Sequence, residues 1–384
     1  MSSLLDTINQ KTSFDKFRQK GVEVFEKLGF PSSKVEEYKY SPLNKIFSEA
    51  ELSYSENIIE GDSYYDKEGV TKCSLKDFSE KNEIIFNKYF NKLAEKENDA
   101  MVGINTALCS NGNVIFISKG ATTKEPITID LSFQNNNFGV RELIILEKGA
   151  IAKIIINHNQ QDVSWARVCE IFIGEGANLE IVETNIKDVS SRMVNTIIVE
   201  QKANSFFKHT IAVAKKGFCR NNIKVNLIGD YAECILNGVA VTCDDWHTDN
   251  ATIIHHIAEN CISRQLYRNI AKDESTAVFN GNIFVEIGAQ KTEAYQKNNN
   301  ILLSEEANIY TKPQLIINAD DVKCSHGATV GQLDEEALFY ARQRGLSLPM
   351  AQRLLLGSFI GEVLDVISDE ELKESIKESL SERL

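Results

Sequence analysis

The fold of this chain is decided by GAIAKIIIN at residues 149–157 and by GANLEIVET at residues 176–184, which repeat one pattern. A third copy, GDYAECILN, occupies residues 229–237, and KANSFF at residues 202–207 supplies the middle one. The first two copies begin 27 residues apart, and the third begins 53 residues further on, or about two periods. A repeat of this length, made of short strands and tight turns, predicts a solenoid whose coils stack on one another.

The helix and strand signals on either side of these repeats divide the chain into three regions. We expect a helical N-terminal region at residues 1–95, a parallel β-helix core at 96–331 and a C-terminal helical domain at 332–384. Short β-branched runs bounded by Gly, Asn and Asp fill the middle region, and a capping-box pattern at residues 368–371 begins the last helix. A β-sandwich is the rival architecture, but it has no reason to repeat itself. The flanking helices are predicted to cover the ends of the solenoid, where unpaired backbone would otherwise be exposed.

Composition limits the classes of partner. A net charge of −13 over 384 residues argues against a nucleic-acid binder, which needs a concentrated basic surface. Residues 1–6 lack the basic and apolar segments of a secretory signal, and no apolar run approaches the ~20 residues of a membrane span. The eight cysteines include no C-x-x-C and are typical of reduced thiols. We therefore expect a cytoplasmic protein that contacts neither nucleic acid nor membrane.

The strongest candidate site lies at residues 318–331, where a thiol, an imidazole and two carboxylates gather. Cys324 and His326 are two residues apart, so on an extended segment both side chains project from the same face. This pair suits a metal or a sulfur species. The alternative is a structural role, because cysteine is often a buried packing residue. A closed zinc site needs four ligands, so a metal held here needs further ligands from elsewhere in the chain or from a partner.

Motifs for nucleotide binding or catalysis are few in this sequence. The chain has neither G-x-x-x-x-G-K-[ST] nor G-x-G-x-x-G, so we expect no nucleotide to bind to it alone. The cluster Asp244-Asp245-Trp246-His247-Thr248-Asp249 gives an alternative function, that of a carbohydrate-active β-helix enzyme using these carboxylates for acid/base catalysis. The same residues equally fit a polar turn. Of His255 and His256, which are consecutive, at most one can join any given site on a strand.

Several motifs together indicate a family. DDVKCSHGATVG at residues 320–331, followed by LFYARQRG at 338–345, resembles the C-terminal signature of the SufD family, subunits of the SUF iron–sulfur cluster assembly machinery. The resemblance extends to FNG at residues 279–281, to TKPQL at 311–315 and to EEYKY at 36–40. The paralogous SufB subunits place acidic residues on both sides of the histidine, where this chain has Ser325 and Gly327. The resemblance to SufD is therefore preferred, although many relatives have tryptophan at the position of Tyr38.

The resemblance implies a right-handed parallel β-helix between helical ends. It also implies a non-catalytic scaffold in a complex with SufB and the ABC-type ATPase SufC, with a transient iron–sulfur cluster shared at the SufB interface. By correspondence His326 contributes to that site, as an iron ligand or a proton-transfer group, and Cys324 assists. A purely structural scaffold, with His326 satisfied in the core, is the remaining alternative. In isolation we expect the chain to be able to form a homodimer through the surface meant for SufB.

The resemblance also implies that SufC docks on the C-terminal helices. An apolar stripe runs along residues 347–366, and the preceding helix belongs to the family signature. Part of such a stripe packs within the chain, but a helical appendage this small can leave some of it for a partner. The predicted partner-binding residues are Phe339, Arg342, Leu354, Leu355, Phe359 and Val363.

Overall fold

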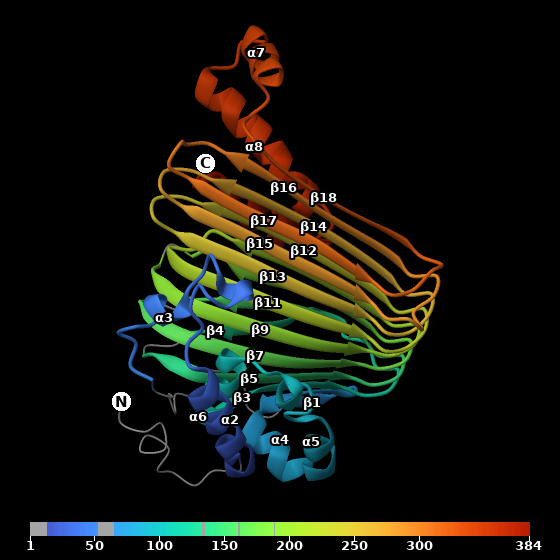
Figure 1. Cartoon of the computed structure of the whole chain (residues 1–384). Helices are drawn as coiled ribbons and strands as arrows, with labels where there is room; N and C mark the ends of the chain where they lie inside the picture. Colours follow the sequence, from blue (N-terminus) through green and yellow to red (C-terminus); the bar gives the residue numbers. More distant parts are fainter. Residues whose placement is uncertain (1–13, 53–64, 133–134, 160–161, 188) are drawn as a thin grey trace.

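A computed structural model describes residues 14–52, 65–132, 135–159, 162–187 and 189–384, and the N-terminal residues 1–6 lie outside this range. Two parallel sheets wind around a common interior, as Figure 1 shows. The strands are β1 (Tyr65–Lys67), β2 (Val70–Ser74), β3 (Asn111–Ile117), β4 (Ile127–Leu131), β5 (Asn137–Leu146), β6 (Ile151–His158), β7 (Val163–Ile173), β8 (Asn178–Asn185), β9 (Ser191–Gln201), β10 (Phe206–Val213), β11 (Gly217–Leu227), β12 (Glu233–Thr242), β13 (His247–His256), β14 (Ile262–Ala271), β15 (Thr276–Val285), β16 (Glu293–Leu302), β17 (Asn308–Ile317) and β18 (Lys323–Gly331).

Strand order confirms the predicted parallel solenoid. One sheet runs β1-β2-β3-β5-β7-β9-β11-β13-β15-β17 and the other β18-β16-β14-β12-β10-β8-β6-β4. From β3 onward, successive strands therefore alternate between the sheets, and from β5 onward each pairs in parallel with the strand one coil before it. The antiparallel pairs β1–β2 and β2–β3 extend one sheet at its N-terminal end. The prediction of a helical N-terminal region missed these two short strands.

A turn with one left-handed residue per coil generates the repeat. Positive φ occurs at Gly149, Gly176, Asn204, Tyr231 and Asn260, and the backbone N–H of each donates to a carbonyl in the turn one coil further along. Glycine and asparagine suit this conformation because a Cβ is costly there for most residues. The spacings are 27, 28, 27 and 29 residues, so the predicted period of 26 to 27 is slightly short.

The third copy of the repeat was aligned incorrectly from the sequence. The sequence repeat equates Gly229 with Gly176, but β12 pairs with β10 and β10 with β8 so that Glu233 is the counterpart of Asn178. Tyr231 therefore takes the left-handed position of Gly176. The error is two residues, because the turn before β12 is longer and its glycine is not the residue with positive φ.

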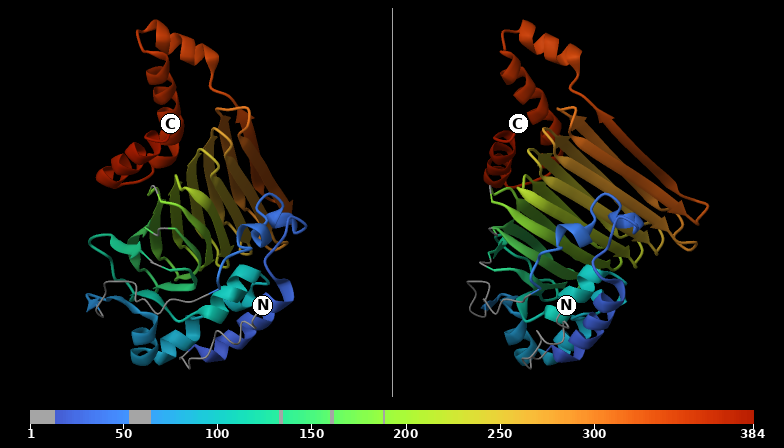
Figure 2. Two further views of the ribbon diagram at one scale, coloured as in Figure 1. Left: turned by 90° about the vertical axis from the view of Figure 1, so that its left-hand side faces the viewer. Right: turned by 60° about the vertical axis from the view of Figure 1, so that its left-hand side comes forward.

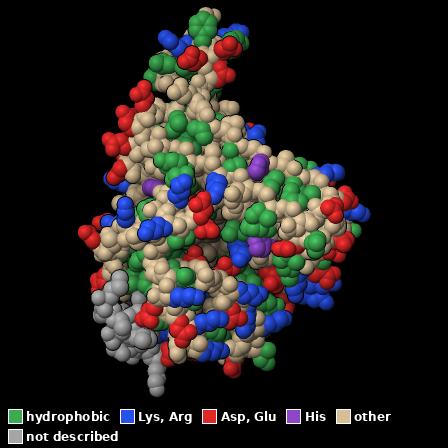
Figure 3. All heavy atoms as spheres, viewed as in Figure 1, with side chains coloured by type: hydrophobic (Ala, Val, Ile, Leu, Met, Phe, Trp, Pro, Cys, Tyr) green, Lys and Arg blue, Asp and Glu red, His purple; other side chains and the backbone are tan. Residues whose placement is uncertain are grey.

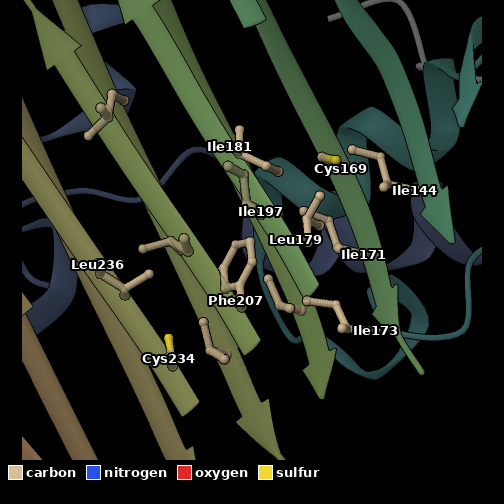
Figure 4. Close-up of a cluster of buried hydrophobic side chains, with 14 of the residues drawn as sticks. Ile144, Cys169, Ile171, Ile173, Leu179, Ile181, Ile197, Phe207, Cys234 and Leu236 are labelled. Carbon is tan, nitrogen blue, oxygen red and sulfur yellow. The ribbon is translucent and has the colours of Figure 1, made fainter. Parts of the chain in front are cut away.

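The interior is filled by the alternating inward residues of both sheets. Ile144, Ile171, Leu179, Ile197 and Phe207 are at most 1% exposed and belong to one continuous core (Figure 4). β-Branched and aromatic side chains pack well on the pleated faces, and period-two alternation directs them inward. The resulting core runs the length of the solenoid and gives it a rigid axis.

Helices cover the first coils (Figures 1 and 2), and they extend past the predicted boundary at residue 95. They are α2 (Asp15–Leu28), η1 (Glu36–Tyr38), α3 (Leu43–Ile46), α4 (Leu75–Lys81), α5 (Glu83–Tyr89), η2 (Ala94–Lys96) and α6 (Ala100–Leu108). Phe14, Phe78, Phe86 and Phe90 pack with outward-facing residues of the first strands in a second core. The apolar beginning of the solenoid is thereby shielded from water.

Three C-terminal helices follow β18: α7 (Glu335–Gln343), α8 (Leu348–Leu364) and α9 (Glu370–Ser381). In Figure 2, α7 and the start of α8 project beyond the end of the solenoid, while the rest of α8 and α9 return along its side. Leu356, Ile360, Val363 and Leu364 pack on the outer face of the eight-stranded sheet. Within the described part of the chain, no helix is both long and apolar enough to cross a membrane.

Candidate functional site

The end of the solenoid opposite the N-terminal helices carries Cys324 and His326. Both lie on β18, the last strand of its sheet, opposite Ala294 and Gln296 of β16 in the parallel ladder. They share the inward face, since Ala294 and Gln296 are buried in the interior. Cys324 is half-buried and packs against the core, whereas His326 is exposed at the open end.

The pair consists of two side-chain types that can bind metals, a thiol and an imidazole. Burial raises the pKa of the Cys324 thiol, so a metal bound here would have to displace the thiol proton. Thiolate sulfur and imidazole nitrogen are ligands for iron. Among the residues that the structure describes, no group of three His, Cys, Asp or Glu side chains is placed to hold a metal.

Both terminal strands leave an edge without a neighbouring strand. β17 and β18 end their sheets, so one row of backbone N–H and C=O groups on each has no strand partner among the described residues. Ile316, Ile317 and Val330 are 43%, 39% and 43% exposed there. An apolar, unpaired edge of this kind favours association with another chain.

The EEYKY motif lies across the outer face of the ten-stranded sheet. The Tyr40 ring stacks on Tyr310 of β17 with centroids 3.9 Å apart, and Glu36 forms an ion pair with Lys312 of the same strand. The hydroxyl of buried Tyr38 donates to Asp99 over 2.8 Å. This segment forms part of the lining of a cavity of about 500 Å³. The motif thus connects the N-terminal region to the terminal coil that carries the site.

The carboxylates of residues 244–249 do not converge. Asp244 and Asp245 are exposed in the turn before β13, whereas Asp249 is 1% exposed and forms an ion pair with Arg220. Asp249 also accepts a hydrogen bond from the Ser41 hydroxyl over 2.5 Å. This arrangement anchors the N-terminal segment on the sheet, so it gives the alternative hypothesis of a carbohydrate-active enzyme no support.

His255 and His256 face opposite sides of β13, as expected. The ring of His255 contacts Phe284 on the outer face, whereas His256 is buried and its Nε2 lies 2.8 Å from the Ser263 hydroxyl. Burial lowers the pKa of His256 to about 3, so its imidazole is neutral. Both are therefore explained by local packing.

The C-terminal helices expose a different apolar surface. Phe339, Tyr340 and Leu354 are 64%, 61% and 57% exposed, and hydrophobic side chains are visible at the projecting tip in Figure 3. Arg342 is also exposed, while Leu355 and Phe359 are partly buried. Val363 is fully buried against the sheet, so its predicted contact with a partner is wrong.

Sequence reasoning missed a charged cluster inside the solenoid. Glu183 of β8 accepts hydrogen bonds from Nε2 of His158 and of His209, over 2.5 and 2.9 Å, and Arg167 of β7 lies 3.3 Å from it. The Arg167 guanidinium also pairs with Glu142. All five side chains are at most 3% exposed. The only signal in the sequence is a charge at an inward position of an alternating strand.

Two family models match the chain. The core model of the "SUF system FeS cluster assembly, SufBD core domain" matches residues 132–359. This range spans the stacked coils and the terminal strand with Cys324 and His326. The chain belongs to the SufBD family. The model of the SufBD N-terminal region matches residues 5–65 and 60–129.

Individual relatives support the SufD-type resemblance. The iron–sulfur cluster assembly protein SufD of Escherichia coli is 37% identical over 190 residues, which cover 50% of this chain and 44% of that protein. A SufBD family protein of Synechocystis is 31% identical over 305 residues, covering 74% and 66%. The chain thus spans less than two thirds of the length of these two relatives. Bacillus subtilis SufB is 23% identical over 370 residues, covering 91% and 75%. Membership of the SufBD family supports a scaffold role in iron–sulfur cluster assembly.

Proposed function

We propose that this chain is a non-catalytic SufD-type scaffold subunit of a SUF complex. It pairs with a SufB homologue through the open terminal coil, where Cys324 and His326 contribute to the site of the nascent cluster. The ABC-type ATPase SufC docks on the projecting C-terminal helices and hydrolyses the nucleotide. The observation that carries this proposal is the exposed coil formed by β17 and β18 in a member of the SufBD family.

The contrast between the two ends of the solenoid supports pairing at the terminal coil. Helices cover the first coils, but the last coil exposes Ile316, Ile317 and Val330 together with unpaired strand edges. A paralogous β-helix offers a matching edge, and strand-to-strand association satisfies both rows of backbone groups. In isolation a second copy of this chain can occupy the same edge, which gives a homodimer.

The incomplete ligand set supports a shared site. Cys324 and His326 offer one sulfur and one nitrogen from the same face of β18. A partner's ligands complete the coordination of iron and sulfide, so the site forms only in the complex. A site divided between two subunits can open when the ATPase moves them apart, which suits a cluster that is cargo rather than a resident cofactor.

Lysine substitutions on the terminal coil test its proposed pairing with SufB. Ile317→Lys combined with Val330→Lys places two ammonium groups in the proposed interface, where each costs about 2 kcal/mol or more if buried without a partner. Co-expression with the host's SufB and SufC homologues, followed by size-exclusion chromatography, should show loss of SufB. The control is Ile84→Lys at a residue that is 87% exposed on α5, which should leave the complex intact. Unchanged co-elution of SufB with the double variant would refute the proposed interface.

Point variants on the tip test ATPase docking. Truncation after Gly331 is unsuitable, because it would uncover the apolar sheet face that Leu356, Ile360 and Leu364 protect. Phe339→Asp with Leu354→Asp instead changes two exposed side chains. We expect the variant to keep SufB and to bind SufC at least about tenfold more weakly, since such anchors are worth more than ~1.4 kcal/mol. Titration of labelled SufC into the purified complex of this chain with SufB measures this affinity. An unchanged affinity would exclude the surface around Phe339 and Leu354 as the docking site.

A further inference from the structure

Gln296 is a buried polar side chain beneath the terminal coil. It lies on β16 at 3% exposure, directly beneath His326 in the parallel ladder and on the same inward face. Within the described part of the chain, neither its Nε2 nor its Oε1 has a hydrogen-bond partner. An unsatisfied buried amide is costly, so packing alone would favour an apolar side chain at this position.

Gly281 makes room for this carboxamide. A Cβ on Gly281, which lies on β15 in the opposite sheet, would be 2.2 Å from Nε2 and 2.8 Å from Cδ of Gln296. The φ of Gly281 is not in the left-handed region, so space rather than backbone conformation requires the glycine. The glycine of the FNG motif thus allows the amide of Gln296 to lie across the interior beneath the terminal coil.

His326, if it binds a metal through one ring nitrogen, needs a hydrogen-bond acceptor for the N–H of the other. A histidine that gives one ring nitrogen to a metal donates the N–H of its other nitrogen to an acceptor, which sets the tautomer and the orientation of the ring. Adjacent strands are about 4.8 Å apart, so side chains paired in register can reach each other. Gln296 Oε1, one strand away on the same face, is a buried acceptor to which no described residue donates a hydrogen bond.

A second orphaned group lies across the interior. Thr311 is on the last strand of the ten-stranded sheet, opposite the inward-facing Phe279, and its Oγ1 is buried without a partner among the described residues. The hydroxyl can accept from Gln296 Nε2 when the amide turns toward His326. In the occupied site, Gln296 Oε1 would then accept from the His326 ring and Nε2 would donate to the Thr311 hydroxyl.

We propose that Gln296 is the positioning residue for His326, accepting its ring N–H and thereby directing the other ring nitrogen to iron. This inference rests on the proposed function of His326. Gln296 acts through the imidazole and does not itself bind the metal. Without a cluster, the Gln296 amide has no hydrogen-bond partner among the residues that the structure describes, which lowers the stability of the fold.

Gln296→Met tests the proposal, because methionine matches the shape of glutamine without its hydrogen-bonding groups. We expect the melting temperature of the purified complex to stay unchanged or rise, since a buried unsatisfied amide is removed. Cluster yield after reconstitution with ferrous iron and sulfide should nevertheless fall about tenfold or more, the usual effect of losing such a contact. Gln296→Glu keeps the acceptor and should recover part of the yield. A folded Gln296→Met complex with full yield would overturn the proposal.

Gly281→Ala provides a second perturbation that leaves Gln296 in place. The added methyl group displaces the carboxamide, so cluster yield should fall as in Gln296→Met. In complexes labelled with ¹⁵N-histidine, pulsed electron paramagnetic resonance of the reduced cluster should show a weaker nitrogen coupling in both variants. An unchanged coupling would assign Gln296 a role in packing only.

Normal cluster yield from His326→Ala would instead contradict the proposed function itself. Failure of the Gln296 proposal can therefore be distinguished from failure of the proposed function.

Discussion

Replacement of His326 by alanine is expected to reduce cluster assembly by the co-expressed complex at least about tenfold, with no loss of subunits. The imidazole is exposed and its removal leaves no cavity, so the melting temperature should remain within about 1 °C of the unmodified protein. Loss of a direct ligand should cost no less than loss of a group that merely orients one. The measurement is iron and sulfide content per complex, together with the visible absorbance of the cluster.

Two controls sharpen this prediction. His255→Ala removes an imidazole from the outer face of β13, away from the terminal coil, and should leave assembly unchanged. Cys324→Ala keeps most of the packing but removes the sulfur, so reduced yield with normal stability would identify the thiol as a ligand or a sulfur carrier. Normal yield from His326→Ala would remove this residue from the assembly site. A drop in stability without a selective loss of assembly would favour the structural alternative.

Glu183→Gln is expected to have the largest effect on stability, about 3–5 kcal/mol at neutral pH. The substitution leaves the two imidazoles in the core without the carboxylate that they contact. It also removes one of the two carboxylates that contact the Arg167 guanidinium, Glu142 being the other. Chemical denaturation followed by circular dichroism measures the loss. Glu175→Gln is the matched control, because Glu175 pairs with Lys148 at the surface and its change should cost less than about 1 kcal/mol. Equal effects of the two substitutions would contradict the prediction.

The same cluster predicts a pH dependence of stability. Burial alone raises the pKa of Glu183, but Arg167 and hydrogen bonds from His158 and His209 outweigh it and hold the pKa well below the ordinary value of 4.5. A carboxyl with a depressed pKa in the folded state contributes stability that is fully present above 4.5. That contribution declines as pH falls from there through the folded-state pKa. The difference in stability between the unmodified chain and Glu183→Gln should therefore narrow below pH 4.5.

Local pattern was sufficient for most of the architecture. Gly149 and Gly176 mark true equivalent positions because glycine is the default residue for a left-handed turn, so the repeat is visible in the residues themselves. The third turn was misplaced because Tyr231 takes that conformation, and tyrosine carries no such signal. Helix α8 shows the same limit. It is apolar on nearly every side, so the pattern could not distinguish exposed Leu354 from buried Val363.

The stacked coils, the helical ends and the placement of Cys324 and His326 on one face follow from the amino-acid sequence alone, because they depend on periodicity and spacing along the chain. That this face lies at an open end is known from the three-dimensional arrangement of the strands. The same holds for the burial of Asp249 under the N-terminal segment, and for Gln296, whose amide has no hydrogen-bond partner among the described residues. Burial and partnership depend on segments far apart in the chain, such as Ser41 and Asp249, and no local pattern encodes which of them meet.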